Sequence, residues 1–507
     1  MEKEYDIIII GSGVGGGTVA DVFSKYVQKG LNVLILEGGP YRKKEHFNQR
    51  ENDMSSIYFN KGAFLSKNLH IGLAAGNTVG GSSAVYTGVS FRPPKSVIEN
   101  WKSSFGLSFL TDDYVEQTLS EHEEQLNIKE LPESYDNDNN RLFKKGANNL
   151  NIEIKRLRIN VRNCQQQGFC NLGCTVGAKQ GTLELQIPDS VANGVELIYN
   201  AWVHEITSHS VKFNISKAIA ESEPNKWKEG LYEFGAKVIV LAGGVLQTPA
   251  LVLRSLKNLS IKNKLIGRYL SLHPVFNLNA VYKEKIKNFR GFPKTYYIDQ
   301  FSDTEGYYLE TSFYYPGITA KNIPGHGKIH QDIMRKYEQM MSILILSHDP
   351  SEYHNRITID KQGKPILNYK VNKNVKESLT KAIQRAAAIF FSAGCTEMII
   401  PGTEKYLLNT EDKEHLADLI HSKNIQFERT PLSSAHPQGG MRMTKSVKTG
   451  VVNTDGLLNG TKSIYVADAS IFPSSVKVNP YQTIMLMANH VANRIIANHF
   501  TEKNRTV

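Results

Sequence analysis

The sequence predicts an α/β protein that contains a doubly wound, mainly parallel sheet. The β-branched run Ile7–Ile10 ends at a glycine and leads into residues with helical spacing. A second apolar run, Val238–Ala242, leads through a Gly-Gly pair into another helix-like stretch, and the C-terminal stretch is punctuated by glycine and ends in a helical pattern. Short continuous apolar runs that alternate with helices are typical of buried parallel strands.

Length and composition indicate an ordinary globular protein. The 507 residues correspond to roughly three domains, or two large ones, at about 150 residues per domain. A content of 40% hydrophobic and 21% charged residues excludes global disorder. Every apolar run is far shorter than the ~18 residues needed to span a bilayer, so we expect no transmembrane helix.

The charge pattern restricts the classes of partner. The 60 Lys and Arg residues exceed the 49 Asp and Glu residues, which gives a net charge of +11. The basic residues are scattered and no zinc-finger spacing occurs, so we expect no nucleic-acid partner. A basic surface can still attract anionic lipid or an acidic electron-transfer protein. Because the start, Met1–Gly13, lacks a secretory signal, we expect a cytoplasmic protein, which the charge allows to bind peripherally at the inner membrane face.

The N-terminal segment consists, in order, of an expected strand, turn, helix and strand. Tyr5–Ile10 is the first strand. Thr18–Lys29 has apolar residues at helical spacing and ends at Gly30, a usual helix terminator. Leu31–Leu36 is the second strand. This order is that of a dinucleotide-binding βαβ unit.

The turn between the first strand and the helix carries a GxGxxG motif. Gly11 allows the tight turn, Gly13 lets a pyrophosphate approach the backbone, and Gly16 permits close helix–strand packing. The helix N-terminus then stabilises the phosphate charge. Glu37 ends the second strand, where a carboxylate can accept hydrogen bonds from a ribose diol. In this context the motif predicts dinucleotide binding.

Further elements follow along the chain. An irregular Gly- and Ser-rich segment at 76–88 provides backbone that can wrap a large flat ligand. Residues 275–430 are mixed and contain alternating aromatic runs such as Tyr307–Tyr315. From periodicity we expect helices near 111–125, 246–256 and 483–500, and strands near 151–162, 194–206 and 236–242.

Several motifs occur in a characteristic order. They are GSGVGGG at the first turn, GGSSAVYTG (Gly80–Gly88), AKVIVLAGGVLQTPALVLRS (Ala236–Ser255), IGRYLSLHP (Ile266–Pro274), HPQGGMRM (His436–Met443) and the stretch Ile464–Ala488. As an ordered set they resemble the glucose–methanol–choline (GMC) oxidoreductase family. SFRPP (Ser90–Pro94) and GAKQGT (Gly177–Thr182) resemble its long-chain alcohol oxidase-like bacterial branch.

The resemblance implies a particular domain organisation. It implies a Rossmann-type FAD-binding domain assembled from the discontinuous segments 1–100, 190–275 and 431–507. The segments 101–189 and 276–430 would then form a sheet-based substrate-binding domain and its connections.

The resemblance also implies how FAD is held. Ala84 stands where members with covalent FAD carry a histidine, so we expect non-covalent FAD. Tyr86 stands where the family often has asparagine, and its role at the flavin is left open. Carried over residue by residue, the expected FAD contacts are Gly11, Gly13 and Gly16 at the pyrophosphate, Glu37 at the adenosine ribose, Gly80, Gly81 and Ser82 beside the flavin, Val203 at the adenine, Asp468 and Ala469 near the ribityl and pyrophosphate, and Tyr481 at the isoalloxazine.

The resemblance also implies the reaction and its catalytic pair: the oxidation of an alcohol CH–OH group to a carbonyl by His436 and Asn479. Removing the hydroxyl proton while hydride leaves for flavin N5 requires a base, and imidazole suits that task near neutrality. His436 would be this base, and Asn479 would donate to the substrate oxygen and fix its orientation. Oxygen, a quinone or a cytochrome-type protein could accept the electrons. A GMC-fold lyase or other non-oxidative flavoprotein is the alternative, because fold does not determine reaction.

Two other histidines invite comparison with a metal site. His326 and His330 have the i,i+4 spacing of a helical metal pair. Gly325 and Gly327 flank the first of them, so we expect no stable helix there. His273 reads as a structural histidine.

Three of the four cysteines are clustered. Cys164, Cys170 and Cys174 resemble a ferredoxin-type run in which Gln167 replaces one ligand. Three thiolates suffice for a 3Fe–4S cluster, which some GMC dehydrogenase subunits carry at this spacing. Thr175 stands where ferredoxins have proline, and buried structural thiols or one disulfide remain the alternatives.

Overall fold

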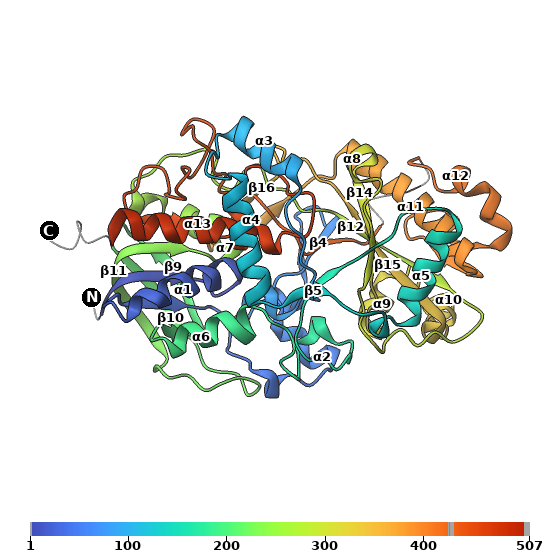
Figure 1. The fold of residues 1–507 in the computed structure, drawn as a ribbon, viewed down its shortest axis with the longest axis horizontal. Helices are drawn as coiled ribbons and strands as arrows, with labels where there is room; N and C mark the ends of the chain where they lie inside the picture. The colour runs from blue at the N-terminus through green and yellow to red at the C-terminus, as the bar shows by residue number, and fades with distance from the viewer. Residues whose placement is uncertain (1–2, 424, 426–429, 501–507) are drawn as a thin grey trace.

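The computed structural model describes residues 3–423, 425 and 430–500. Residues 1–2 and 501–507 of the expected FAD-binding segments, and residues 424 and 426–429 of the expected substrate-binding segment, lie outside the described residues. The molecule is elongated, with one large sheet toward each end (Figure 1). The beginning and the end of the described chain meet at one end, where helix α1 packs against helix α13.

The first sheet contains the predicted dinucleotide-binding unit. Its order is β8-β2-β1-β11-β10-β9, and β21 also pairs with β11. The pairs β8–β2, β2–β1, β1–β11 and β11–β21 are parallel, whereas the pairs β11–β10 and β10–β9 are antiparallel. The strands are β1 (Glu4–Ile10), β2 (Val33–Leu36), β8 (Glu196–Ile198), β9 (Ala201–Ile206), β10 (Ser210–Ile215), β11 (Gly230–Leu241) and β21 (Ile464–Val466). The α/β, Rossmann-type prediction is confirmed, in a sheet of mixed direction.

Helices from both ends of the chain cover this sheet. Helix α1 contacts α6 and α13, and α7 contacts β9. The expected strand at 194–206 is in fact β8 and β9, because Asn200 adopts a left-handed φ of 57° between them. The helices of this part are α1 (Val14–Val27), α3 (Lys95–Phe105), α4 (Asp112–Gln125), α6 (Ile187–Ala192), α7 (Gly244–Leu259) and α13 (Tyr481–His499).

The second sheet is built mainly from the middle of the chain. Its order is β3-β4-β20-β12-β15-β14-β13-β6, with β18 and β19 continuing from β12. Helix α11 packs against α5 and against three of its strands (Figure 1). The elements are β3 (Phe64–Leu65), β4 (Ile71–Leu73), β6 (Lys155–Arg156), β12 (Val275–Val281), β13 (Tyr296–Ile298), β14 (Tyr307–Thr311), β15 (Met340–Ser347), β18 (Glu397–Ile399), β19 (Leu407–Asn409), β20 (Leu432–Ser434), α5 (Asp138–Asn149) and α11 (Lys373–Ala393).

The strand register of the second sheet separates two faces. Alternate residues point to opposite faces, and directly paired residues share a face. Phe276, Leu278 and Ile345 belong to the main core on the side of α11. Val275 pairs with Leu346, which pairs with Tyr308, and these three pack together on the opposite face with Phe91.

Smaller elements complete the fold. These are α2 (Glu51–Met54), the pair β5 (Ile128–Glu130) and β7 (Arg158–Asn160), the hairpin β16 (Arg356–Ile359) and β17 (Pro365–Asn368), α8 (Ser302–Glu305), α9 (Pro316–Asn322), α10 (Gly327–Met334) and α12 (Leu416–Leu419). Helix α10 corrects the expectation of no helix at His330: the helix begins just after His326, and His330 Nε2 lies 2.9 Å from the Ala320 carbonyl oxygen. Within the described ranges, none of the helices is long and apolar enough to cross a membrane.

Candidate active site and dinucleotide cleft

A cleft opens where the parallel strands of the first sheet end. Ile10, Leu36 and Leu241, the last residues of β1, β2 and β11, all line it. Ligands of open α/β sheets bind at this carboxyl edge. Its other lining residues include the Gly11–Gly15 turn, Glu37, residues 75–77, Gly81, Ser82, residues 201–203, residues 242–248, Ala435, Pro437, Asp468, Ala469, Pro480 and Ile484.

The glycine turn has the conformation and close packing that the motif predicts. Gly11 has a φ of +103°, and a Cβ there would lie 2.3 Å from the Ala242 carbonyl oxygen. A Cβ on Gly16 would lie 2.0 Å from the Gly11 carbonyl oxygen, so Gly16 serves helix–strand packing. Gly13 lines the cleft and nearly touches Gly81, since a Cβ added to Gly81 would come within 2.9 Å of the Gly13 Cα.

Glu37 lies in the cleft and organises the turn. Its Oε2 accepts hydrogen bonds from the Ser12 N–H (2.9 Å) and Ser12 Oγ (2.7 Å), and its Oε1 accepts one from the Gly39 N–H (2.7 Å). Burial raises the pKa of Glu37, and these hydrogen bonds oppose the shift. A carboxylate has about four lone-pair sites, so capacity remains for a ribose hydroxyl.

Asp468 holds a second turn at the cleft. Its Oδ2 accepts from the Gly244 N–H (2.8 Å) and from Thr248 Oγ1 (2.6 Å), which attaches the N-terminus of α7 to the C-terminal segment. Gly244 has a φ of +77°, and no described atom lies within 4 Å of a Cβ built on it. Gln247 also lines the cleft, and both polar atoms of its amide are buried without a partner among the described residues.

The remaining expected cofactor contacts divide into two groups. Ser82, Val203 and Ala469 line the cleft. Gly80 and Tyr481 lie outside its lining: a Cβ on Gly80 would meet Leu183 Cβ at 2.7 Å, and Tyr481 is 5% exposed.

Tyr86 packs beside Tyr481 in a buried polar cluster. The two rings lie 5.1 Å apart between centroids, and Asn160 Nδ2 donates to the hydroxyl of Tyr86. Glu184 lies next to this pair, and within the described structure both of its buried carboxylate oxygens lack a hydrogen-bond partner. Burial raises the pKa of Glu184 to about 7, although the ammonium of Lys179 partly opposes that shift.

His436 follows β20 in a loop that borders the cleft, although His436 itself is not one of the lining residues. Its neighbours Ala435 and Pro437 line the cleft, and its ring meets that of His273 edge-on at 5.8 Å. Its buried Nδ1 has no partner in the part of the chain that the structure describes. Burial, assisted by the positive charge of Lys294, lowers the pKa of His436 to about 3, so the imidazole is neutral at physiological pH.

Asn479 is 6% exposed and is held from the second sheet. Tyr308 of β14 donates a 2.6 Å hydrogen bond to its Oδ1. The residue after Asn479, Pro480, lines the cleft. The loops of the two candidate catalytic residues also touch, because Gln438 Oε1 accepts from the Val476 N–H at 2.8 Å. His273 Nε2 lies 2.7 Å from Ser475 Oγ, and its buried Nδ1 has no partner among the described residues.

The three clustered cysteines form a separate group. All are free thiols, and left-handed glycines at Gly168 and Gly173 loop the chain between them. Burial raises the pKa of Cys170 to about 12, and its neighbours Cys164 and Cys174 add to that shift. The three sulfur atoms nevertheless do not gather within 4.8 Å of one another.

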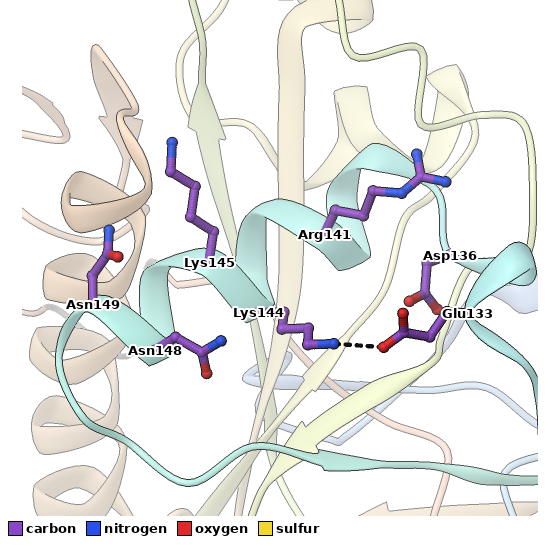
Figure 2. A pocket seen from close by; sticks show the side chains of 7 residues that line it. All are labelled: Glu133, Asp136, Arg141, Lys144, Lys145, Asn148 and Asn149. Atoms are coloured by element: carbon purple, nitrogen blue, oxygen red, sulfur yellow. Dashed lines mark hydrogen bonds and ion pairs between the residues drawn. The ribbon is translucent and has the colours of Figure 1, made fainter.

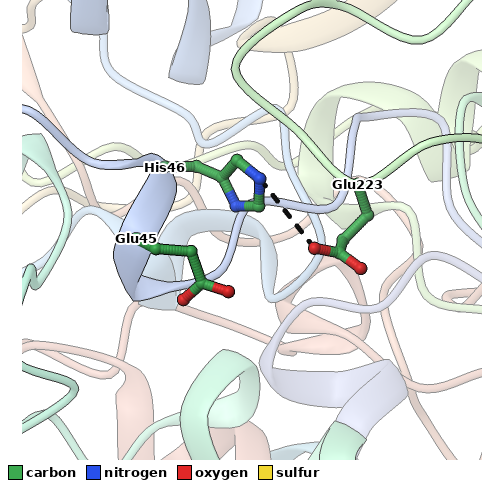
Figure 3. A group of neighbouring side chains, drawn as sticks. All are labelled: Glu45, His46 and Glu223. Carbon is green, nitrogen blue, oxygen red and sulfur yellow. Dashed lines mark ion pairs between the residues drawn. The ribbon is translucent and has the colours of Figure 1, made fainter.

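Two polar groupings lie away from the cleft. A surface pocket on α5 is lined by charged side chains that are largely paired, such as Lys144 with Glu133 at 2.7 Å (Figure 2). Glu45, His46 and Glu223 bring their ligand atoms together in a second group (Figure 3). There Lys43 already neutralises Glu223 at 2.9 Å, so neither grouping indicates a ligand.

The cleft fits an extended dinucleotide. Its lining includes backbone at several glycines, the carboxylate of Glu37 and the neighbours of His436, and the unpartnered amide of Gln247 provides a further polar contact. The sequence analysis did not assign Gly244 and Gln247 to the site. The feature that could have identified them is the Gly-Gly pair after the strand 236–242, which repeats the strand–glycine–helix pattern of the first turn.

Comparison with known proteins agrees with this geometry. Two family models described as GMC oxidoreductase match residues 54–275 and 351–488. A long-chain-alcohol oxidase of Arabidopsis thaliana is 27% identical over 98% of this chain and 69% of its own length. A GMC-type oxidoreductase of Mycobacterium tuberculosis is 26% identical over 97% of this chain and 76% of its own length.

Solved structures share the fold at low sequence identity. Formate oxidase of Aspergillus oryzae superposes with a TM-score of 0.72 at 14% identity, covering 98% of this chain and 99% of that one. Pyridoxine 4-oxidase of Mesorbium loti superposes with a TM-score of 0.71 at 16% identity, covering 98% and 100%. The chain therefore belongs to the GMC oxidoreductase family, as an FAD-dependent enzyme that acts on alcohol-type donors.

Proposed function

We propose that this protein oxidises a CH–OH group of a small-molecule alcohol to a carbonyl, with His436 as the general base and Asn479 as the orienting donor. One observation carries the proposal. Ala435 and Pro437, on either side of His436, and Pro480, next to Asn479, line the same cleft, and the Val476 N–H donates to Gln438 Oε1 between the two loops. The two side chains that alcohol oxidation needs therefore belong to joined loops that border the dinucleotide cleft.

The chemistry of the two residues follows from their surroundings. Burial lowers the pKa of His436, so its imidazole is neutral and has a free lone pair that can accept the hydroxyl proton as hydride leaves the substrate carbon. Tyr308 occupies Oδ1 of Asn479, which leaves the amide N–H groups to donate to the substrate oxygen. FAD, when bound, supplies the acceptor for the two electrons and the hydrogen that leave the substrate carbon.

We propose that FAD is bound non-covalently, because Ala84 offers no side chain that could form a bond to the flavin. Acid precipitation of the purified yellow protein should release FAD into the supernatant. Flavin that stays with the precipitate would show a covalent bond at another residue, and a protein that takes up no FAD on reconstitution would contradict the cofactor assignment.

The direct test of the function is anaerobic bleaching of the flavin by a panel of alcohols. An oxidoreductase reduces its flavin when a substrate alcohol is added, whereas a lyase of the same fold leaves the flavin oxidised while it consumes its substrate. We propose oxygen as the electron acceptor, since relatives are named oxidases. Admission of air after bleaching should restore the yellow colour, with one hydrogen peroxide formed per flavin. A quinone or a cytochrome-type protein is the acceptor if reoxidation in air is slow.

Two further features stay predictions. The first is a 3Fe–4S cluster at Cys164, Cys170 and Cys174. In its support, the thiols lie within electrostatic reach of one another, and Cys174 Sγ accepts the Ala178 N–H at 3.2 Å. The second is peripheral association with an anionic membrane surface, which rests on the net charge alone.

A further inference from the structure

The face of the second sheet that carries Tyr308 also holds buried polar side chains that the proposed reaction does not use. Tyr308 and Glu310 are two residues apart on β14, so both point to this face about 7 Å apart. The register places Leu344 beside Glu310 and Asn277 beside Leu344. A second row of side chains, next to the row of Tyr308, therefore extends away from Asn479.

The centre of this second row is a buried ion pair. Lys294 Nζ lies 2.6 Å from Glu310 Oε2, and the side chains are 9% and 0% exposed. Glu310 is two residues from Tyr308, whose hydroxyl bonds Asn479, so the ion pair lies on the sheet face that contacts Asn479. Glu310 Oε1 is buried and has no partner among the residues that the structure describes.

Two asparagines on β12 add unpartnered donors. Asn277 and Asn279 are two residues apart on β12, so both point to the face that carries Glu310. Ser342 Oγ donates to Asn277 Oδ1 at 2.5 Å, but in the described chain the Nδ2 atoms of both asparagines are buried without an acceptor. A buried polar atom without a partner costs about 1–3 kcal/mol, so such a concentration beside a reaction site indicates a ligand.

We infer that Lys294, Glu310, Asn277 and Asn279, here called the polar patch, bind a second hydroxyl group of the substrate, so that the enzyme acts on a polyhydroxylated alcohol rather than on a simple alkyl alcohol. This inference rests on the proposed function and names its substrate class. The polar patch offers one free acceptor, Glu310 Oε1, and free donors on both asparagines. A hydroxyl group is both donor and acceptor, so hydroxyls satisfy both kinds of atom at once.

Charge and packing argue against two other substrate groups at the polar patch, a carboxylate and an alkyl chain. A carboxylate on the substrate would meet Glu310, whose charge Lys294 already neutralises, so the polar patch offers it no net attraction. An alkyl chain would leave the unpartnered polar atoms buried against hydrocarbon, which is unfavourable. Leu344 lies between Asn277 and Glu310, and Leu346 and Val275 lie in the neighbouring row, where they can contact the carbon skeleton of a polyol.

The first experiment compares substrates in the holoenzyme. Anaerobic flavin reduction is measured with alkan-1-ols from hexanol to decanol and with glycerol, xylitol, sorbitol and glucose. We expect polyols to reduce the flavin with kcat/KM values at least about tenfold higher than those of the alkanols. Reduction by alkanols but not by polyols would overturn this inference and leave the proposed function intact. Reduction by none of these alcohols would overturn both.

The second experiment removes the ion pair as a unit. The double variant Lys294→Met/Glu310→Leu leaves no uncompensated buried charge, so it should fold and retain FAD. We expect its kcat/KM for the best polyol to fall by about 10–100-fold more than its kcat/KM for the alkanols, mainly through a higher KM. The ratio of the two kcat/KM values cancels any effect of the lost Lys294 charge on His436, because that effect is common to both substrates. The matched control is Lys336→Met/Glu397→Leu, which removes another 2.6 Å Lys–Glu pair and should keep the polyol preference. A polyol preference unchanged in the Lys294 variant would overturn the inference.

Discussion

The hydroxyl of Tyr308 donates a 2.6 Å hydrogen bond to Oδ1 of Asn479, a residue 171 positions later in the chain. The bond joins β14 of the second sheet to the loop that precedes α13. Because Oδ1 already accepts this bond, the N–H groups of Asn479 are the part of the amide left for the proposed contact with a substrate. A residue of the second sheet thus determines which half of the amide is available.

Replacement of Tyr308 by phenylalanine should slow flavin reduction by about 2–10-fold, because one neutral hydrogen bond contributes about 0.5–1.5 kcal/mol. The measurement is stopped-flow bleaching by a saturating alcohol, with FAD content as a check on folding. Tyr307→Phe is the matched control, since Tyr307 points to the opposite face of the same strand and donates to Glu305 at 2.9 Å. Equal losses in both variants would mean that the effect is one of stability.

His436→Ala should keep FAD but reduce it more slowly by about 10²–10⁴-fold, the usual range for loss of a general base. Asn479→Ala should cost less, because it removes an oriented hydrogen bond and not the proton acceptor. The exposed His326→Ala is the control and should bleach like wild type. A normal rate in His436→Ala would place the base elsewhere, and loss of FAD from that variant would make its rate uninformative until reconstitution.

Glu184→Gln should stabilise the protein at high pH. The folded-state pKa of Glu184 is about 7, above the ordinary value, so ionisation of this carboxyl destabilises the folded protein as pH rises from about 4.5 to 7. Gln does not titrate. The variant should therefore gain about 3 kcal/mol relative to wild type at pH 8 and almost nothing at pH 4.5. Chemical unfolding at both pH values measures this, with the exposed Glu130→Gln as a control. A gain independent of pH would refute a raised pKa.

Iron and acid-labile sulfide in anaerobically purified protein test the cysteine cluster. A 3Fe–4S centre predicts about three iron atoms per chain and, when oxidised, a paramagnetic signal near about g = 2. Cys170→Ser should abolish both, whereas Cys395→Ser, at a buried thiol just after α11, should leave the metal content unchanged. Full FAD occupancy without iron would make the three thiols structural.

Local patterns predicted the elements of the first sheet well, but some boundaries depended on packing. The first helix begins at Val14 and not at Thr18, because Gly15, Gly16 and Gly17 adopt helical geometry. A Cβ on Gly15 would lie 1.8 Å from the Ala467 carbonyl oxygen, so these glycines are needed by a neighbour that is distant in sequence. Likewise α10 forms after His326 despite its flanking glycines, with Ile333 buried in a satellite core.

In the candidate site, too, some residues were predicted from the sequence and others were brought together only by the fold. The glycine turn and Glu37 were predicted from their local motif, whereas His436 and Asn479 were implied by the resemblance to the GMC family. Tyr308 and Glu310 were part of an aromatic run with no readable role, and Lys294 was one basic residue among many. Their importance follows from the antiparallel register of β14 and β15, which a single sequence does not specify.

The sequence by itself predicted the strand–turn–helix units and the dinucleotide-binding turn, because backbone geometry at glycine and side-chain chemistry act over a few residues. The candidate catalytic pair came from the family resemblance of the sequence. Only the tertiary structure decided which amide face Asn479 presents and that Lys294, Glu310 and the β12 asparagines share one buried face. Those relationships join segments far apart in the chain, and they arise from strand register and burial, which are properties of the whole fold.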